Sequence, residues 1–343
     1  MSDLVSLAMR AGRRVLGDAA MQARFRRLAQ GRMSAPDQHT IVVQQHGRQI
    51  AYRFFFVLGY GKSGTNWLGA VLNLHPHIWC DGEFHLQAFT EAARRFTGPD
   101  YAVGHREPYR TLAEEGARDL IRRLLLAGAA RRPSARWIGD RSPRAFEALL
   151  PTAPHIYLVR DGRDVAVSWT YHHLRARRGE NLWWWPPEMR ALLERWIPTF
   201  DSGDAGARDA AGAMLAEESW VRFTIGRWAE QLRADREAME AARAAGTPVE
   251  IVRYESLHAD MDATRERLYR LLGLDPALAA PASAHDGTSP GFEVERPSAF
   301  RRRGAVGDWR NYSPDIIRRV YEDLASDLED FGPDGALARM TAQ

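Results

Sequence analysis

The sequence predicts an α/β fold in which helices cover both faces of a parallel β-sheet. Three observations lead to this class: short runs of aromatic and branched residues, amphipathic stretches of helical length, and the alternation of the two along the chain. With 343 residues, 45% of them hydrophobic and 27% charged, the chain can bury a sizeable core and has an ordinary globular composition. We therefore expect one large domain, and the chain contains no internal repeats.

The first strand is predicted at 52–58, where the run Tyr-Arg-Phe-Phe-Phe-Val-Leu is typical of a buried strand. A glycine-rich loop over 59–64 follows, and then a helix over 65–74 that ends before a His-Pro pair. Later segments repeat the same alternation. Strands are predicted at 136–139, 153–159 and 249–252, and helices at 112–130, 163–173, 216–245, 262–273 and 314–330.

Three segments lie outside this pattern, so we place the domain at 51–335. Residues 1–50 carry eight arginines against three aspartates, and we predict a basic helical extension there. Its helix could rest on an anionic membrane or pack, solvated, on the domain. Residues 175–215 contain three consecutive tryptophans and a Gly/Asp/Ala-rich tract, which indicates an insertion or flexible lid. Residues 336–343 are expected to form a tail.

Composition limits the compartment and the partners. One cysteine, Cys80, excludes an internal disulfide framework and favours a reducing compartment. No apolar run reaches the roughly 18 residues of a membrane span, and the N-terminus lacks the features of a secretory signal. We therefore predict a cytoplasmic protein. A net charge of +3 gives no indication of a nucleic-acid partner, and the 11 scattered histidines form no recognisable metal motif.

Lysine usage singles out one position. Of 47 basic residues 46 are arginine, and the only lysine is Lys62. The arginine bias indicates a GC-rich genome. Because a compact ammonium and a planar guanidinium are not interchangeable, the one lysine indicates a chemical requirement that arginine does not meet.

Lys62 lies in Gly59-Tyr-Gly-Lys-Ser-Gly-Thr-Asn-Trp67, between the first strand and its helix. Glycines allow successive backbone N–H groups to converge on an anion at the helix N-terminus, so we expect a phosphate cradle here; a glycine turn with an incidental lysine is the alternative. The ATP/GTP P-loop pattern is excluded, because Phe56 stands where its first glycine is needed. The candidate binding residues are Gly61, Lys62, Ser63, Gly64, Thr65, Asn66 and Trp67.

This loop resembles that of the PAPS-dependent sulfotransferases, whose Lys-Ser-Gly-Thr-x-Trp core, here at 62–67, binds the 5′-phosphate of the donor. Three further segments follow in the family's order, and together they cover most of 52–312. The resemblance implies a single, P-loop-like sulfotransferase domain of a bacterial protein, with PAPS as donor, PAP as product and no metal. Trp67 would stack on the base, unless it is a core tryptophan.

The second segment is 160–168, Arg-Asp-Gly-Arg-Asp-Val-Ala-Val-Ser, directly after a predicted strand. A cation at a strand end and a hydroxyl two helical turns later could hold one phosphate together, although a surface ion-pair cluster is the alternative. The resemblance makes Arg160 and Ser168 ligands of the 3′-phosphate.

The last two segments lie near the C-terminus. Residues 300–311 carry a basic pair, a glycine and Gly-Asp-Trp, which resembles the end of the family's core and implies that Arg302, Arg303 and Gly304 close over the 3′-phosphate. The pair Tyr254-Glu255 resembles the family's strand-end pair, so Tyr254 is expected to meet the adenine edge.

The reaction needs a base, and the family has two patterns for it. One branch uses a histidine in the segment that is Gly-Asp-Arg-Ser-Pro here, at 139–143, which contains none. A second branch, like the tyrosylprotein and heparan enzymes, uses a glutamate seven or eight residues after a His-Pro pair, which is Glu83 here. We predict Glu83 as general base, with partial burial raising its pKa, and His85 as second candidate; a surface glutamate is the alternative.

The same resemblance places Arg141 beside the sulfate, with Asp140 and Arg144 as its structural neighbours, and Lys62 at the bridging oxygen. The acceptor, a small molecule, glycan, lipid or peptide with a hydroxyl or an amine, is left open, as is the oligomeric state. Tryptophans 183–185 and Trp196 could form the floor of its pocket, whereas tryptophans 220 and 228 are expected in the core. The competing classes are a P-loop nucleotide kinase or NTPase and a non-catalytic nucleotide-binding protein.

Overall fold

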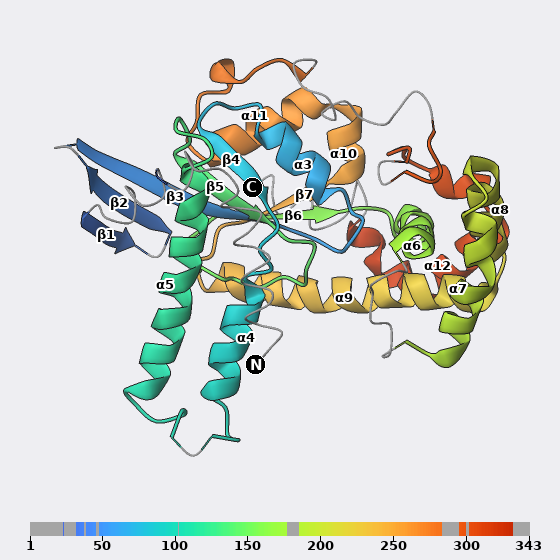
Figure 1. Ribbon diagram of the computed structural model, residues 1–343, viewed down its shortest axis with the longest axis horizontal. Coiled ribbons are helices and arrows are strands. Elements are labelled where there is room, and N and C mark those ends of the chain that lie inside the picture. Colours follow the sequence, from blue (N-terminus) through green and yellow to red (C-terminus); the bar gives the residue numbers. More distant parts are fainter. Residues whose placement is uncertain are drawn as a thin grey trace.

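The structure, a computed structural model, describes residues 23, 32–37, 39–45, 48–101, 103–176, 185–282, 295–299 and 302–331. Within these residues a seven-stranded sheet crosses the molecule and helices lie on both of its faces (Figure 1). The predicted α/β class with a parallel central sheet is confirmed. Every strand and helix predicted between 52 and 330 is present with boundaries shifted by a few residues.

Five strands form the parallel part of the sheet. The central strand β3 (Arg48–Leu58) pairs with β5 (Trp137–Arg141) on one side and, near its end, with β6 (His155–Val159) on the other. Outside these lie β4 (Ile78–Gly82) and β7 (Val249–Arg253). All five run the same way, so their carboxyl ends share one edge of the sheet.

The N-terminal segment corrects the prediction for residues 1–50. β1 (Arg32–Asp37) and β2 (Thr40–Gln45) form an antiparallel hairpin on the first half of β3, which itself begins at Arg48. In β2 Ile41 and Val43 are buried, as a half-buried strand requires. Residues 32–37, 40–45 and 48–50 are therefore strand and not helix, and the expected amphipathic helix near the N-terminus lies outside the described residues.

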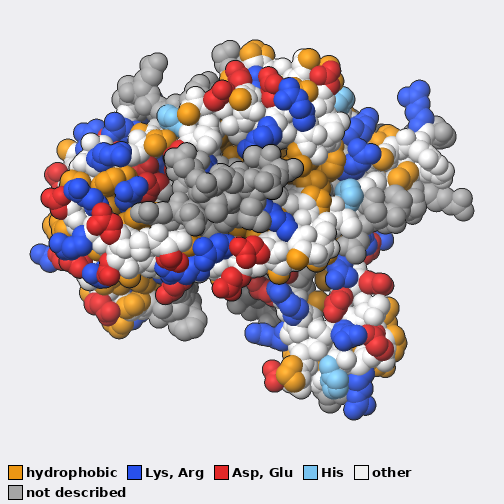
Figure 2. All heavy atoms as spheres, turned by 180° about the vertical axis from the view of Figure 1, so that it is seen from behind, with side chains coloured by type: hydrophobic (Ala, Val, Ile, Leu, Met, Phe, Trp, Pro, Cys, Tyr) orange, Lys and Arg blue, Asp and Glu red, His pale blue; other side chains and the backbone are white. Residues whose placement is uncertain are grey.

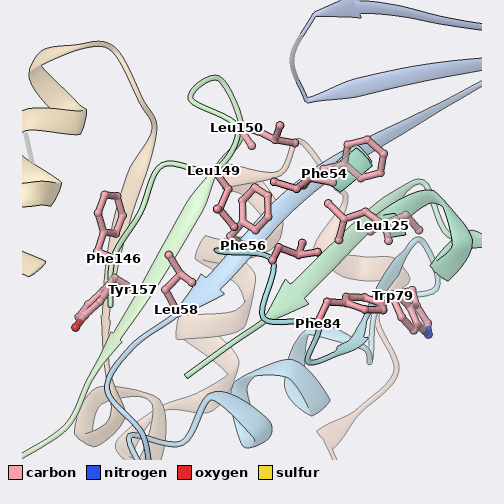
Figure 3. Close-up of a cluster of buried hydrophobic side chains, with 14 of the residues drawn as sticks. Phe54, Phe56, Leu58, Trp79, Phe84, Leu125, Phe146, Leu149, Leu150 and Tyr157 are labelled. Carbon is pink, nitrogen blue, oxygen red and sulfur yellow. The ribbon is translucent and has the colours of Figure 1, made fainter. Parts of the chain in front are cut away.

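Alternate residues of β3 enter the cores on opposite faces of the sheet. Phe54, Phe56 and Leu58 join the cluster of Figure 3, which is covered by α5 (Tyr109–Ala129) and α9 (Glu218–Ala244). Phe55 and Val57 face α3 (Thr65–Leu72) and α11 (Met261–Leu271). A strand buried on both faces has no polar side, which explains its continuous apolar run.

A third cluster lies beyond the sheet, between α6 (Gly162–Ala176), α7 (Pro187–Phe200), α8 (Asp204–Leu215), α12 (Pro314–Ala325) and the start of α9. The described part of the predicted insertion is therefore packed helix and not a flexible lid.

Two of the tryptophan predictions can be judged from the structure. Trp185 is 4% exposed and lies 4.4 Å from the ring of His173, so it belongs to the core and not to the floor of an acceptor pocket. Tryptophans 183 and 184 lie outside the described residues. Trp220 and Trp228 are buried, as predicted.

Neither α4 (Gln87–Phe96) nor the short α10 (Tyr254–Ala259) was predicted from the sequence. α4 and α5 project together from the body as an arm (Figure 1), and Figure 2 shows apolar and charged side chains intermingled on it. No helix among the described residues is long and apolar enough to cross a membrane. The 3₁₀ turns are Pro276–Leu278, Asp308–Asn311 and Ser326–Phe331.

Candidate functional site

Three segments far apart in the sequence meet at the carboxyl edge of the parallel strands. β3, β6 and β7 are followed directly by Gly59, Arg160 and Tyr254. Ligands of open α/β sheets bind at this edge, in the crevice outside the strand ends. The predicted binding residues therefore share one location because the strands are parallel and adjacent.

The loop between β3 and α3 has an unusual backbone. Lys62 adopts a left-handed conformation with φ 71°, and Gly64, the residue that caps α3, has φ 101°. Ser63 is 1% exposed, and its Oγ has no hydrogen-bond partner among the described residues. The first amides of a helix have no acceptors within the helix, so the N-terminus of α3 is a place where an anion could bind.

Two glycines of this loop are required by close packing. A Cβ on Gly64 would lie 2.6 Å from Cδ2 of Tyr254, and a Cβ on Gly61 would lie 2.4 Å from the ring of Trp169. Both distances are below van der Waals contact, so larger side chains would displace the loop.

We expect Gly64→Ala to lower the Tm by more than the matched variant Gly246→Ala. Both glycines have positive φ, which costs another residue about 1–3 kcal/mol, but a Cβ on Gly246 would meet nothing within 4 Å. Thermal unfolding followed by calorimetry measures the difference. Equal losses would show that the contact with Tyr254 contributes nothing.

Arg160 and Tyr254 join the loop to the C-terminal segment. The guanidinium of Arg160 lies over the Tyr254 ring at 4.2 Å, and its Nη1 donates to the Lys62 carbonyl at 3.3 Å. Its Nη2 donates to the Ala305 carbonyl at 2.9 Å, and the Tyr254 hydroxyl donates to the Gly304 carbonyl at 2.6 Å. The four segments predicted to bind the donor are thus joined by direct contacts: the loop 59–67, the segment 160–168, the pair 254–255 and the C-terminal segment, through its residues 304 and 305.

Tyr254 is 4% exposed, so it is enclosed by its neighbours and presents little open face. Trp67 meets it edge-on, with ring centroids 5.2 Å apart. Asn66 is exposed on α3, and Thr65 is buried at its first position. Ser168 lies half-buried on α6, two turns after Arg160.

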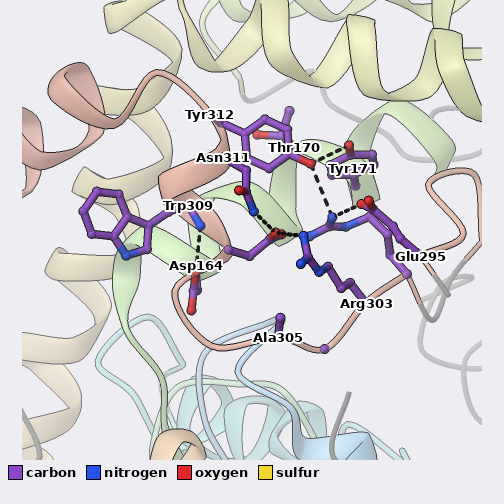
Figure 4. A network of polar contacts seen from close by, with 12 residues as sticks. Asp164, Thr170, Tyr171, Glu295, Arg303, Ala305, Trp309, Asn311 and Tyr312 are labelled. Carbon is purple, nitrogen blue, oxygen red and sulfur yellow. Dashed lines mark hydrogen bonds and ion pairs between the residues drawn. The ribbon is translucent and has the colours of Figure 1, made fainter. Parts of the chain in front are cut away.

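The arginines of the C-terminal segment lie in an ion-pair network (Figure 4). Arg302 contacts the carboxylates of Glu295 and Asp308, and its guanidinium lies 4.3 Å from the centroid of the Tyr171 ring. Arg303, with a side chain 40% exposed, donates to Asp308 at 3.0 Å. The structure thus places Arg302 between two acidic side chains, and Arg303 is the more accessible cation.

Asp164 anchors this segment to α6. Its carboxylate accepts the N–H groups of Gly307 at 2.7 Å and Trp309 at 3.1 Å (Figure 4). Burial raises the pKa of Asp164, and the nearby charge of Arg160 opposes that shift. The buried carboxylate of Asp164 therefore fixes the loop that carries residues 302–304 to α6.

Three of the four predicted catalytic residues, Glu83, His85 and Arg141, lie at the ends of β4 and β5, whereas Lys62 lies in the loop after β3. Glu83 Oε1 lies 3.5 Å from His85 Nε2, and Glu83 Oε2 lies 3.8 Å from Arg141 Nη1. The Glu83 side chain is 38% exposed, whereas that of Arg141 is 16% exposed. Arg144 Nε donates to His85 Nδ1 at 3.3 Å.

Arg141 also packs on α3, the helix that follows the glycine-rich loop. A Cβ on Gly69 of α3 would lie 2.7 Å from its Cδ. The Arg141 side chain therefore packs on α3 through its Cδ, and its guanidinium lies near the Glu83 carboxylate. Among the described residues no group of three or more His, Cys, Asp or Glu side chains could hold a metal ion.

Comparison with known proteins decides the family. Residues 53–332 match the family model described as the sulfotransferase domain. The chain belongs to the sulfotransferase family. The family predicted from the loop and its three companion segments is confirmed, and with it the enzyme class.

The sulfotransferase is 23% identical to Sulfotransferase 1E1 of Rattus norvegicus over 283 residues, which are 78% of this chain and 80% of that protein. Among solved structures it resembles mouse sulfotransferase SULT7A1 complexed with PAP, at 16% identity and a TM-score of 0.41, over 88% of this chain and 98% of that chain. It also resembles a sulfotransferase from Alicyclobacillus acidocaldarius, at 17% identity and a TM-score of 0.37, over 80% and 95%.

Two residues that contact the candidate binding residues were not predicted from the sequence. Trp169 lies against Gly61 and stacks on His173 at 4.5 Å. His258 lies 6.1 Å from the rings of both Trp67 and Tyr254, and burial together with Arg160 lowers its pKa. A signal for His258 existed, since it stands four residues after Tyr254 and therefore on the same helix face.

Proposed function

We propose that the sulfotransferase moves the sulfuryl group of PAPS to a hydroxyl or an amine of an acceptor and releases PAP, with Glu83 as general base. One observation carries the choice of donor: a glycine-rich cradle and a buried arginine meet at a single sheet edge. The cradle is the loop 59–64, and the arginine is Arg160.

The residues at this edge fit a donor with two phosphates. The buried Ser63 Oγ and Arg160 Nε have no hydrogen-bond partner among the described residues. Buried polar groups are nearly always paired, and phosphate oxygens would satisfy both. The mouse relative was solved with PAP, which has both phosphates. Lys62 and Ser63 would hold the 5′-phosphate, and Arg160, Ser168 and residues 302–304 the 3′-phosphate.

The transfer itself is an in-line displacement. The acceptor oxygen or nitrogen bonds to sulfur as the bond between sulfur and the phosphate oxygen of PAPS breaks. The acceptor proton passes to the base, and negative charge builds on the leaving phosphate oxygen. The ammonium of Lys62 would stabilise that oxygen, and Arg141 the oxygens of the moving sulfuryl group.

Geometry favours Glu83 over His85 as the base. Nδ1 of His85 accepts a hydrogen bond from Arg144, so in the neutral ring the proton is on Nε2, which faces Glu83. Burial and Arg144 lower the pKa of His85, which keeps that ring neutral near pH 7. Both ring nitrogens are therefore engaged, and the Glu83 carboxylate has exposed surface for an acceptor.

Arg160→Ala is expected to weaken PAP binding about 10- to 100-fold, since hydrogen bonds to charged groups contribute roughly 1.5–3 kcal/mol. Calorimetric titration with PAP measures this. The control is Arg222→Ala, because Arg222 pairs with Glu218 and Asp323 on the surface of α9 and α12. Unchanged PAP affinity in Arg160→Ala would mean that the 3′-phosphate lies elsewhere.

The proposed function is tested by titrating the protein with PAP, ADP and Mg·ATP. Tight binding of PAP without metal, and much weaker binding of ADP, is the expected result. A preference for Mg·ATP would favour a kinase or NTPase instead. Radiolabelled PAPS offered with a phenol, a tyrosine peptide, an amino-sugar oligosaccharide and a glycolipid then searches for the acceptor, and PAP binding with no transfer to any of them would favour a non-catalytic nucleotide-binding protein.

A further inference from the structure

A buried carboxylate at the end of β5 holds the segment that carries Glu83. Asp140 is 0% exposed, and its Oδ1 accepts the N–H of Phe84 at 2.9 Å. Its Oδ2 accepts the hydroxyl of Ser142 at 2.8 Å, and Ser142 Oγ in turn accepts the N–H of His85 at 3.2 Å. Two successive amides after Glu83 are therefore tied to β5.

The backbone that these bonds hold is not one that it would adopt freely. His85 has φ 52°, in the left-handed region that side chains other than glycine disfavour. Such a conformation persists only where the surroundings enforce it. Phe84, the first of the two residues whose amides are held, is 8% exposed and packs near Trp79 in the core. The segment is thus fixed on its apolar side and at its amides.

The neighbour of Asp140 completes the arrangement. Successive residues of a strand point to opposite sides, so Arg141 turns away from the buried carboxylate and lies near the carboxylates of Glu83 and Asp81. The end of β5 therefore contacts the Glu83 segment in two ways. Asp140 and Ser142 accept the amides of Phe84 and His85, and the Arg141 guanidinium lies near the Glu83 carboxylate. Burial raises the pKa of Asp140 to about 6, so a carboxylate at this position is costly.

We propose that Asp140, together with Ser142, is a positioning residue for sulfuryl transfer, because it fixes the backbone of residues 83–85 so that the Glu83 carboxylate faces the acceptor. The proposal rests on the proposed role of Glu83 as base. A carboxylate accepts both the Phe84 amide and the Ser142 hydroxyl, whereas an asparagine in the same place has one accepting oxygen.

The test starts with Asp140→Asn and hydrogen exchange measured on the segment 82–86. We expect the amides of Phe84 and His85 to exchange at least about tenfold faster than in the unchanged protein. Transfer from labelled PAPS should fall about 10- to 100-fold in kcat, with the affinity for PAP unchanged. Ser142→Ala, which removes the bonds of the Ser142 hydroxyl to Asp140 and to the His85 amide but keeps the bond between Asp140 and the Phe84 amide, should show the same pattern in weaker form and serves if Asp140→Asn does not fold.

A matched control is offered by a second buried carboxylate. Asp235 is 1% exposed, accepts the N–H of Phe146 at 2.7 Å, and contacts the hydroxyl of Tyr157. Asp235→Asn should lower the Tm in a similar way, yet leave the exchange of residues 84 and 85 and the kcat of the folded protein unchanged. If Asp235→Asn reduced kcat as much as Asp140→Asn, the effect would be one of general stability and the proposal would be overturned.

A double variant tells the two proposals apart. If Asp140 acts through Glu83, then adding Asp140→Asn to Glu83→Gln should lower kcat little further. Unchanged exchange in both Asp140→Asn and Ser142→Ala would overturn the positioning role whatever the base is. Full transfer by Glu83→Gln would overturn the base, and with it this proposal, so each failure appears in a different variant.

Discussion

Replacing Lys62 by alanine is expected to reduce the rate of sulfuryl transfer at least about a hundredfold, because electrostatic stabilisation of a leaving oxygen typically contributes that much. Lys62 is the only lysine in the chain and lies in a left-handed turn whose carbonyl is held by Arg160. The backbone contacts therefore fix the position from which the Lys62 side chain, with its ammonium group, extends. Single-turnover transfer from labelled PAPS measures the loss without a contribution from product release.

Lys62→Arg separates charge from shape. It keeps the positive charge but spreads it over a planar group, so we expect transfer well below that of the unchanged protein. In a chain that otherwise uses 46 arginines, full activity of Lys62→Arg would show that the lysine has no chemical role. Transfer by Lys62→Ala within about tenfold of the unchanged rate would contradict the stabilisation of the leaving oxygen.

Glu83→Gln is expected to lower transfer at least about a hundredfold while PAP affinity stays nearly the same. Glutamine has the same shape as glutamate and cannot take the acceptor proton. Glu83 lies near Arg141 and His85, outside the contacts that join the loop 59–64 to Arg160, so the donor site should be left intact. Parallel measurement of transfer and of PAP binding checks both halves of this prediction.

His85→Gln is the comparison that decides between the two candidate bases. Because its two ring nitrogens face Arg144 and Glu83, we expect a smaller loss of transfer than in Glu83→Gln. The reverse order, with His85→Gln inactive and Glu83→Gln active, would make the histidine the base. A large loss of PAP affinity in Glu83→Gln would instead mean that this carboxylate supports the donor site.

Much of the donor site could be predicted from local sequence. The glycine-rich loop, the arginine after the second buried strand and the tyrosine after the last one each stand at a strand end, and parallel strands bring such ends together. The contacts of Arg160 with the Lys62 carbonyl and the Tyr254 ring agree with that reasoning. The roles of these residues toward PAPS remain those proposed above.

Other features could not be predicted, because their cause lies in distant residues. The segment Asp204–Leu215, Asp-Ala-Gly-Ala-Arg-Asp-Ala-Ala-Gly-Ala-Met-Leu, has few large apolar side chains, and its helix is stabilised by packing on α6 and α7. The first strands were hidden by the arginine-rich composition around them. The ion pairs of Arg302 with Glu295 and Asp308 were likewise not predicted, because the folded chain brings these side chains together.

By itself, the sequence of this protein determined the order of four of the parallel strands and of the helices predicted between them, and which residues stand at the ends of those strands. It did so because apolar periodicity and glycine placement act over neighbouring residues. Only the tertiary structure decided what those residues touch: that Trp169 closes on Gly61, that Asp140 holds the amides after Glu83, and that His85 is engaged on both sides. The contacts made by Asp140, Arg144 and Trp169 join residues 56 to 108 positions apart, and a pattern of neighbouring residues does not specify which distant side chains folding brings together.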